Sequence, residues 1–200
     1  MWHTGRYAEA IETSRLAVDA DAKYIAAVAD PGFYTTACAH DWHLMMYAAM
    51  LQGSAAAADA AVDGMRRLLP LERLDVDIPH LRSTLEAYSS MAMHVDVRFG
   101  RWQAIAAAPL IDDLTLQPVT TAMARYAKGV AYAALGDQAA AEEQRSAFRA
   151  VVPQISSDRR FFNNAARDVL AVAEAMLDGE VEYHAGHHPA AFEHLREAVR

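Results

Sequence analysis

Two histidines, His40 and His43, lie three residues apart in the apolar stretch AHDWHLMMYAAMLQG at residues 39–53. In a helix this spacing places both imidazoles on one face, with their Cβ atoms about 5–6 Å apart. Two imidazoles at that separation can bind one metal ion, with zinc–nitrogen distances of about 2.0–2.1 Å. Thr36 and Tyr47 continue the same face, so the sequence predicts a polar stripe on an otherwise apolar helix.

A metal site on this stripe would need a third ligand from another helix. The natural donors are His94 and Glu86, which lie eight residues apart and therefore close to one helix face. Zinc, iron or copper would fit such a site, and nearby methionines could add thioether ligands to copper; they are Met46, Met50, Met91 and Met93. The zinc-protease pattern H-E-x-x-H and the di-iron pattern E-x-x-H do not occur in the sequence.

The alternative interpretation is that the stripe lines a groove and that the methionines fill the core. On that interpretation the groove-lining residues are expected on several helices; they are Thr36, His40, His43, Tyr47, Glu86, Arg125, Asn164 and Arg167. Arginine can clamp a carboxylate or a peptide backbone there through two hydrogen bonds. Asn163 and Asn164 could equally cap the start of a helix.

Other candidates for chemistry favour structural explanations. The histidines at 184, 187 and 188 straddle Gly186, so we expect an exposed turn between helices. Cys38 is expected to be a buried, unreactive thiol, since His40 at i+2 does not face it. The sequence contains no G-x-S-x-G, G-x-G-x-x-G or P-loop motif, and it therefore favours a protein that is not an enzyme.

Composition narrows the class of protein further. The chain has 200 residues, 54% of them hydrophobic, and a formal charge of −8 from 18 basic and 26 acidic residues. This charge disfavours binding to nucleic acid or to an anionic membrane. A single cysteine, no signal peptide and no apolar run of about 18 residues predict a cytoplasmic protein.

Helix-favouring residues dominate, and glycine and proline cluster between apolar-periodic runs. The sequence predicts helices over residues 6–26, 33–51, 54–69, 81–98, 101–107, 118–135, 137–153, 162–185 and 188–199. The segment LDVDI is predicted to be a loop, and VDVRF is predicted to be helical. The fold class expected is therefore all-α.

Internal repetition is the strongest organising signal. Five glycines each open a predicted helix and precede a small or aliphatic residue by five positions; the pairs are Gly5/Ala10, Gly53/Ala58, Gly100/Ile105, Gly136/Ala141 and Gly186/Ala191. Glycine in a left-handed conformation would end one helix, and the small residue would let the next helix pack closely on it.

These residues resemble a tetratricopeptide repeat. The segment GVAYAALGDQAAAEE carries the resemblance through Gly129, Tyr132, Gly136 and Ala141. Two further segments fit the same pattern; they contain Gly179, Gly186, Ala191, Leu195 and Ala198 in one, and Gly5, Tyr7, Ala10 and Ala17 in the other. The whole chain also resembles uncharacterised bacterial tetratricopeptide-like proteins. The resemblance implies a right-handed α-solenoid of antiparallel helix pairs that binds proteins or peptides in a concave groove.

We therefore expect one repeat domain over residues 1–200, with units near 1–30, 31–70, 80–108, 117–154 and 161–200. The first and last units lack capping helices, which predicts a piece of a longer array or self-association through the ends. Three functions are compatible with the sequence: a binding module without a cofactor, a metal-binding protein or metal-dependent enzyme centred on His40, His43 and His94, and a structural subunit of an assembly.

Overall fold

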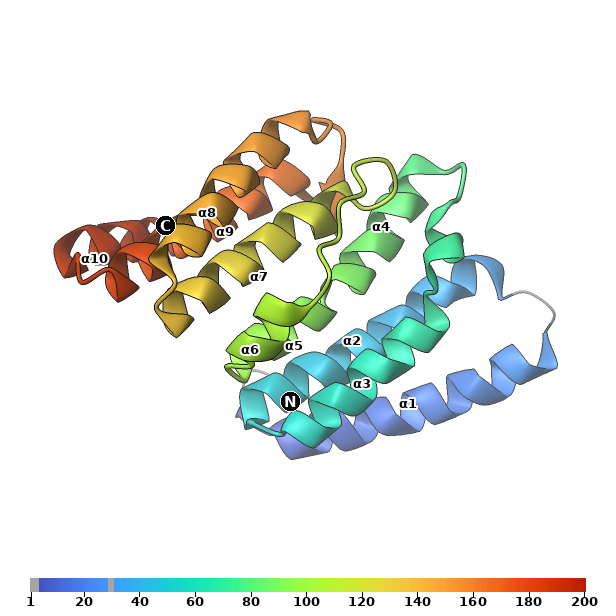
Figure 1. Ribbon diagram of the computed structural model, residues 1–200. Helices are drawn as coiled ribbons and strands as arrows, with labels where there is room; N and C mark the ends of the chain where they lie inside the picture. Colours follow the sequence, from blue (N-terminus) through green and yellow to red (C-terminus); the bar gives the residue numbers. More distant parts are fainter. Residues whose placement is uncertain (1–3, 29–30) are drawn as a thin grey trace. The chain divides into compact units, whose positions relative to one another are not determined.

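The computed structural model describes residues 4–28 and 31–200, and their regular structure is almost entirely α-helical (Figure 1). The all-α class predicted from the sequence is therefore correct. Contacts between residues divide the chain into two compact units, Met1–Val76 and Asp77–Arg200. Each unit is described by itself.

The described part of the first unit contains the long helices α1 (Tyr7–Ala27), α2 (Thr35–Gln52) and α3 (Ala55–Leu68) and the short 3₁₀ helices η2 (Gly32–Tyr34) and η3 (Leu71–Leu74). Helix α2 packs against both α1 and α3. Its contact with α3 is close because Gly64 has no side chain: a Cβ atom there would lie 2.5 Å from Cε2 and Cζ2 of Trp42. Trp42 is thus a packing residue, as the sequence predicted.

The second unit is built around α7. Its elements are α4 (Pro79–Ser90), α5 (Ala92–Arg98), α6 (Trp102–Ala107), α7 (Pro118–Leu135), α8 (Gln138–Val151), η4 (Val152–Gln154), β1 (Arg160–Phe161), β2 (Asn164–Ala165), α9 (Ala166–His184) and α10 (His188–Glu197). Helix α7 packs against α4, α5, α6, α8 and α9, and α10 packs on α9. The core of this unit therefore surrounds a central helix that is buried along most of its length.

Two of the predicted helices have different limits in the structure. The helix predicted over residues 81–98 is divided at Met91 into α4 and α5. Just before the break, the Ser90 hydroxyl donates to the carbonyl of Ala87 (2.8 Å) and so competes with the regular helix bonds. The helix predicted from residue 162 begins only at Ala166, because β1 and β2 form a short antiparallel hairpin in which Phe161 pairs with Asn164.

The five repeated glycines all adopt the left-handed conformation that the sequence predicted for them. Their φ values are 71° (Gly5), 78° (Gly53), 64° (Gly100), 81° (Gly136) and 84° (Gly186). After each of the last four glycines, the next residue donates its backbone N–H to the carbonyl five positions earlier, at 2.9–3.0 Å. One example is the bond from Ser54 N to Ala49 O. This is the Schellman turn, which satisfies carbonyls at a helix end. The small or aliphatic residues that lie five positions after these glycines are at most 7% exposed.

The cost of this conformation can be measured at Gly136. A Cβ atom at this position would meet nothing within 4 Å, so a substitution tests the backbone alone. Gly136→Ala is expected to lower the free energy of unfolding by about 1–2 kcal/mol, because a side chain opposes the left-handed region. Gly136→Asn should lower the free energy of unfolding by less, since asparagine tolerates the left-handed region. Urea unfolding measures both, and an alanine variant as stable as the wild type would contradict the prediction.

Candidate ligand-binding face on helix α2

The polar stripe predicted on α2 lies on the side of the helix that is not buried in the first unit. Tyr47 is 47% exposed and the His40 side chain 55%, whereas Thr36 and His43 are half-buried. The opposite side of the helix carries Cys38 and Met45, which are 1% and 7% exposed. The structure thus places all four predicted residues along one accessible strip of α2.

A buried carboxylate lies behind the first turns of this strip. Asp21 on α1 is only 6% exposed, and its Oδ1 accepts a hydrogen bond from the Tyr34 hydroxyl at 2.7 Å. That hydrogen bond is the main cause that raises the pKa of Tyr34 to about 12. The other oxygen of the carboxylate, Oδ2, is buried and has no hydrogen-bond partner within the described part of the chain.

A second carboxylate, Asp41, adds negative charge at the same place. Burial raises the pKa of Asp41, the nearby charge of Asp21 raises it further, and His40, whose Nδ1 lies 3.4 Å from Oδ1, opposes the shift. Over residues 4–28 and 31–200, neither Asp21 nor Asp41 forms an ion pair with a lysine or an arginine. The local field is therefore negative.

Two aromatic rings lie beside these carboxylates. Tyr24 of α1 and Tyr34 of η2 meet edge to face, with ring centroids 4.7 Å apart, and they are 47% and 41% exposed. We call Asp21, Tyr24, Tyr34 and Asp41 the acidic–aromatic cluster. No motif or spacing in the sequence had indicated this cluster. The available signal was the spacing of the buried positions of α1, Ala10, Ser14, Val18 and Asp21, which places this aspartate on the buried face of the helix.

The cluster also acts on Cys38, which is 1% exposed. Burial, helped by the charge of Asp21, raises the pKa of the thiol to about 11. We expect the folded protein to react with a thiol reagent such as DTNB at least about 100-fold more slowly than the unfolded chain at pH 8, because the thiolate is both scarce and shielded. Rapid labelling of the native protein would contradict this prediction.

Glu86 lies in the second unit and not on a groove surface. It is 0% exposed, and its Oε1 accepts the backbone N–H groups of Val119 (2.7 Å) and Thr120 (3.0 Å) at the start of α7. Its Oε2 forms an ion pair with Arg159, which also donates to the carbonyl of Leu116 at 3.0 Å. The sequence suggested that Glu86 lines a groove or binds a metal. In the structure both of its carboxylate oxygens are engaged within the second unit, because the first N–H groups of a helix need acceptors.

Two other groove candidates of the second unit, Arg125 and Arg167, also have internal partners. Arg125 donates to Gln144 at 3.2 Å, and Arg167 donates to the carbonyls of Pro153 and Ile155. Asn164 is exposed in the hairpin strand β2. The N-cap of α9 is Ala165 and has no side-chain cap, so neither Asn163 nor Asn164 has the capping role considered above.

The predicted third metal ligand, His94, lies half-buried on α5 in the second unit, and burial lowers its pKa. Searched over the described residues, the structure brings no three His, Cys, Asp or Glu side chains together in a way that could hold a metal ion. The histidines around Gly186 lie on an exposed turn, as predicted, with the His187 side chain 68% exposed and 2.8 Å from Glu182.

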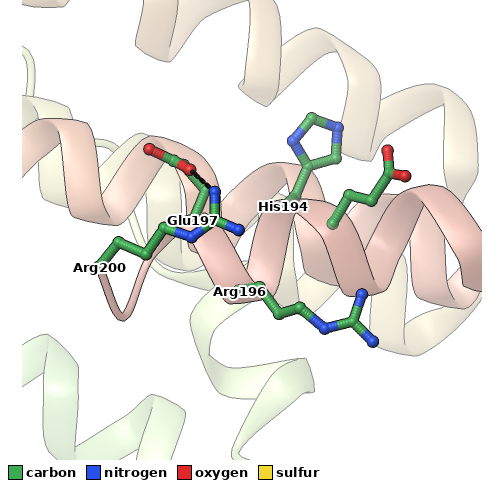
Figure 2. Close-up of a pocket in the computed structure, with 5 residues that line it drawn as sticks. His194, Arg196, Glu197 and Arg200 are labelled. Atoms are coloured by element: carbon green, nitrogen blue, oxygen red, sulfur yellow. Dashed lines mark hydrogen bonds and ion pairs between the residues drawn. The ribbon is translucent and has the colours of Figure 1, made fainter.

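A hollow of about 490 Å³ lies along α10 (Figure 2). Its lining alternates in charge: Glu193, His194, Arg196, Glu197 and Arg200. Glu197 and Arg200 pair with each other at 3.0 Å. Four of these side chains come from α10 and Arg200 lies just beyond its end, and none was a candidate from the sequence. They have the character of a solvated helix face.

Comparisons with protein-family models, with curated proteins and with solved structures find no match to this chain. In the described part of the chain, no helix is both long enough and apolar enough to cross a membrane.

Proposed function

We propose that this chain is a binding module of the tetratricopeptide type, in which the α2 face holds a protein segment. The observation that carries the proposal is the repeated unit of helix, left-handed glycine and antiparallel helix. It occurs at α2–α3, α7–α8 and α9–α10, each with the same pair of hydrogen bonds at its turn. Repetition of one helix pair is typical of solenoids that bind other proteins.

Close helix packing supports the comparison with such repeats. Besides Gly64, two glycines lie where a side chain would collide with a neighbouring helix: a Cβ on Gly129 would lie 2.6 Å from Leu177, and one on Gly179 would lie 2.6 Å from Leu195. These contacts join α7 to α9 and α9 to α10, and closely packed helices can hold surface side chains at fixed positions. A stacked, right-handed solenoid is the arrangement we propose for these pairs.

The α2 face has the composition of a protein-binding surface. It combines a tyrosine with polar side chains, and tyrosine is enriched where interfaces derive most of their affinity. A helix that served only the core would not need Thr36, His40, His43 and Tyr47 along its accessible strip.

A peptide selection tests the proposal. A phage-displayed library of random 12-residue peptides is selected on the purified chain, and the affinity of the recovered peptides is measured by fluorescence anisotropy. Tyr47→Ala is expected to weaken binding by about tenfold or more, as loss of an interface tyrosine does. Tyr183→Ala is the matched control, since Tyr183 is a 45% exposed tyrosine of α9. Failure to recover any peptide, or equal losses in both variants, would contradict a binding role for α2.

A metal site at His40 and His43 is the second candidate. The structure supports it only in that both histidines lie on the accessible strip of α2, and His94 as a third ligand stays a prediction. Elemental analysis of protein purified without a histidine tag tests it. Near-stoichiometric zinc, iron or copper that is lost from the His40→Ala/His43→Ala variant would favour this candidate, and metal-free protein after supplementation would eliminate it.

A further inference from the structure

We infer that the acidic–aromatic cluster of the first unit recognises a cationic side chain, an arginine or a lysine, of a basic protein segment. The inference rests on the proposed function and gives it a chemical class of partner. Asp21 and Asp41 would supply the negative charge, and the rings of Tyr24 and Tyr34 would supply the surface against which the cation packs.

Two other buried acids of this chain show what Asp21 lacks. Glu86 is 0% exposed and Asp178 is 5% exposed, and each is paired with an arginine. Arg159 binds Glu86, and Arg149 donates to both oxygens of Asp178 at 2.7 and 2.6 Å. Asp21 is equally buried, at 6%, but the described residues beside it supply the Tyr34 hydroxyl, the Cys38 thiol and the carboxylate of Asp41, and no cation. A buried charge is costly unless it is paired, so the exception points to a partner from outside the unit.

Two buried side-chain oxygens, one on Asp21 and one on the residue after Tyr34, lack hydrogen-bond partners among the described residues. Oδ2 of Asp21 is buried and has no partner among the described residues, and neither has Oγ1 of Thr35, which follows Tyr34 at the start of α2 and is 3% exposed. Buried polar atoms are nearly always hydrogen-bonded in folded proteins. An ammonium or guanidinium group carries three to five N–H donors, and such donors are what these oxygens lack.

The aromatic rings select the type of cation. Tyr24 and Tyr34 are each more than 40% exposed although they contact one another, so their outer surfaces remain open. Phe33, the neighbour of Tyr34, is 72% exposed. Aromatic faces attract ammonium and guanidinium groups within about 6 Å, and arginine most often. Carboxylates beside exposed tyrosines therefore favour an organic cation.

Access to the cluster involves Tyr34. Its hydroxyl binds Asp21, and its ring is 41% exposed, so it covers the carboxylate on the accessible side. Asp41 and His40 are partly exposed beside it. A basic side chain would meet Asp41 and the rings first, and it would reach Asp21 when the Tyr34 hydroxyl gives up its hydrogen bond.

The probe for this inference is an acetylated Gly-Arg-Gly-Arg-Gly-Arg peptide. An otherwise identical peptide carries citrulline, which has the shape of arginine but no charge. Titration into ¹⁵N-labelled protein at pH 7 and about 0.1 M salt, where remote surface charges are screened, should shift the amide resonances around residues 21, 34 and 41. The citrulline peptide should leave them unchanged.

Two variants with the same change of charge separate recognition from general attraction. Asp21→Asn keeps an acceptor for the Tyr34 hydroxyl but removes the charge. This variant is expected to weaken binding of the arginine peptide by about tenfold or more. Asp63→Asn removes an exposed charge of α3, whose side chain is 63% exposed, and should leave the affinity within about twofold. Equal losses in both variants, equal binding of the two peptides, or no shifts at the cluster would overturn the inference.

Stability distinguishes a ligand-binding carboxylate from a structural one. Because Asp21 has no cationic partner in the described part of the chain, Asp21→Asn is expected to raise the melting temperature by about 2–4 °C. A lower melting temperature together with undiminished peptide binding would show a structural role and overturn the inference. The peptide selection on α2 decides the proposed function separately: selected peptides that need Tyr47 but not Asp21 would leave that function standing without this site.

Discussion

Arg159→Met is expected to lower the free energy of unfolding by about 3–5 kcal/mol, the largest loss that we predict for a single substitution in this chain. The variant would leave the carboxylate of Glu86 buried without its cation, and the Leu116 carbonyl without a donor. The ion pair is well shielded from water, since the side chains of Arg159 and Glu86 are 12% and 1% exposed. Urea unfolding at pH 7.5 measures the loss, and Arg196→Met, which changes an exposed arginine of α10, is the control and should change stability by less than about 0.5 kcal/mol.

The pH dependence of this loss identifies the buried carboxylate as its cause. Burial raises the pKa of Glu86, while Arg159 and the N–H groups of α7 lower it. Without Arg159 the pKa in the folded state rises further above its unfolded value, so the folded variant binds the proton more tightly than the unfolded chain. The stability deficit should therefore shrink as the pH falls from 7.5 to about 5. A deficit independent of pH would contradict this account.

A double substitution gives the complementary test. In Glu86→Gln/Arg159→Met the charge is gone, and the amide oxygen can still accept the N–H groups of Val119 and Thr120. We expect the double variant to be more stable than Arg159→Met alone at pH 7.5, because an apolar or neutral replacement of both partners costs less than one unpaired charge. If adding Glu86→Gln to Arg159→Met lowers the free energy of unfolding further, the two residues do not act as a pair.

Gly64→Ala is expected to produce the second largest effect, a loss of about 2 kcal/mol or more. Alanine favours a helix over glycine by about 1 kcal/mol, so propensity alone would stabilise the variant. The added Cβ, however, would lie 2.5–2.6 Å from three atoms of the Trp42 indole. The ring is rigid and part of the contact between α2 and α3, so the helices must separate, and overpacking of this kind costs about 1–3 kcal/mol or more.

A matched glycine provides the control for this prediction. Gly129→Ala would bring the new Cβ to 2.6 Å from Cδ1 of Leu177, the end of a flexible side chain that can rotate away. The free energy of unfolding should therefore fall less in Gly129→Ala than in Gly64→Ala. Replacing Trp42 with leucine in the Gly64→Ala background should recover part of the lost stability. A Gly64→Ala variant as stable as the wild type would show that α2 and α3 are not in close contact at Trp42.

The predicted helices and turns were largely correct because they depend on neighbouring residues. Gly53 and Gly136 end helices in the left-handed conformation, and this follows from the absence of a Cβ atom at those positions. The helical assignment of VDVRF was also correct, since α5 contains its first four residues and Phe99 is the C-cap of the helix. The helix predicted over residues 162–185 is present as α9, but it begins four residues later than predicted, because the pairing of Phe161 with Asn164 forms a hairpin that helical periodicity does not reveal.

The surroundings of the candidate site residues could not be predicted from local patterns, since they depend on partners far away in the sequence. The stripe of α2 needed only helical spacing, and the structure places its four residues on one strip. Glu86 was expected in a groove, yet its partners lie 33, 34 and 73 residues away and bury it. Lys128 shows the same effect: its ammonium donates to the carbonyls of Ile105, Ala106 and Ala108 at the end of α6, and no local pattern indicates this.

The sequence by itself determined the helical class, the glycine turns and the polar stripe of α2, because hydrogen bonding and side-chain direction within a helix are set by residues up to four or five positions apart. Only the tertiary structure decided which charged groups are paired. Glu86 and Asp21 are both acidic residues on helices, but one lies against an arginine and the other against a tyrosine hydroxyl. The free energy of a buried charge depends on what surrounds it, and packing between distant segments supplies those surroundings.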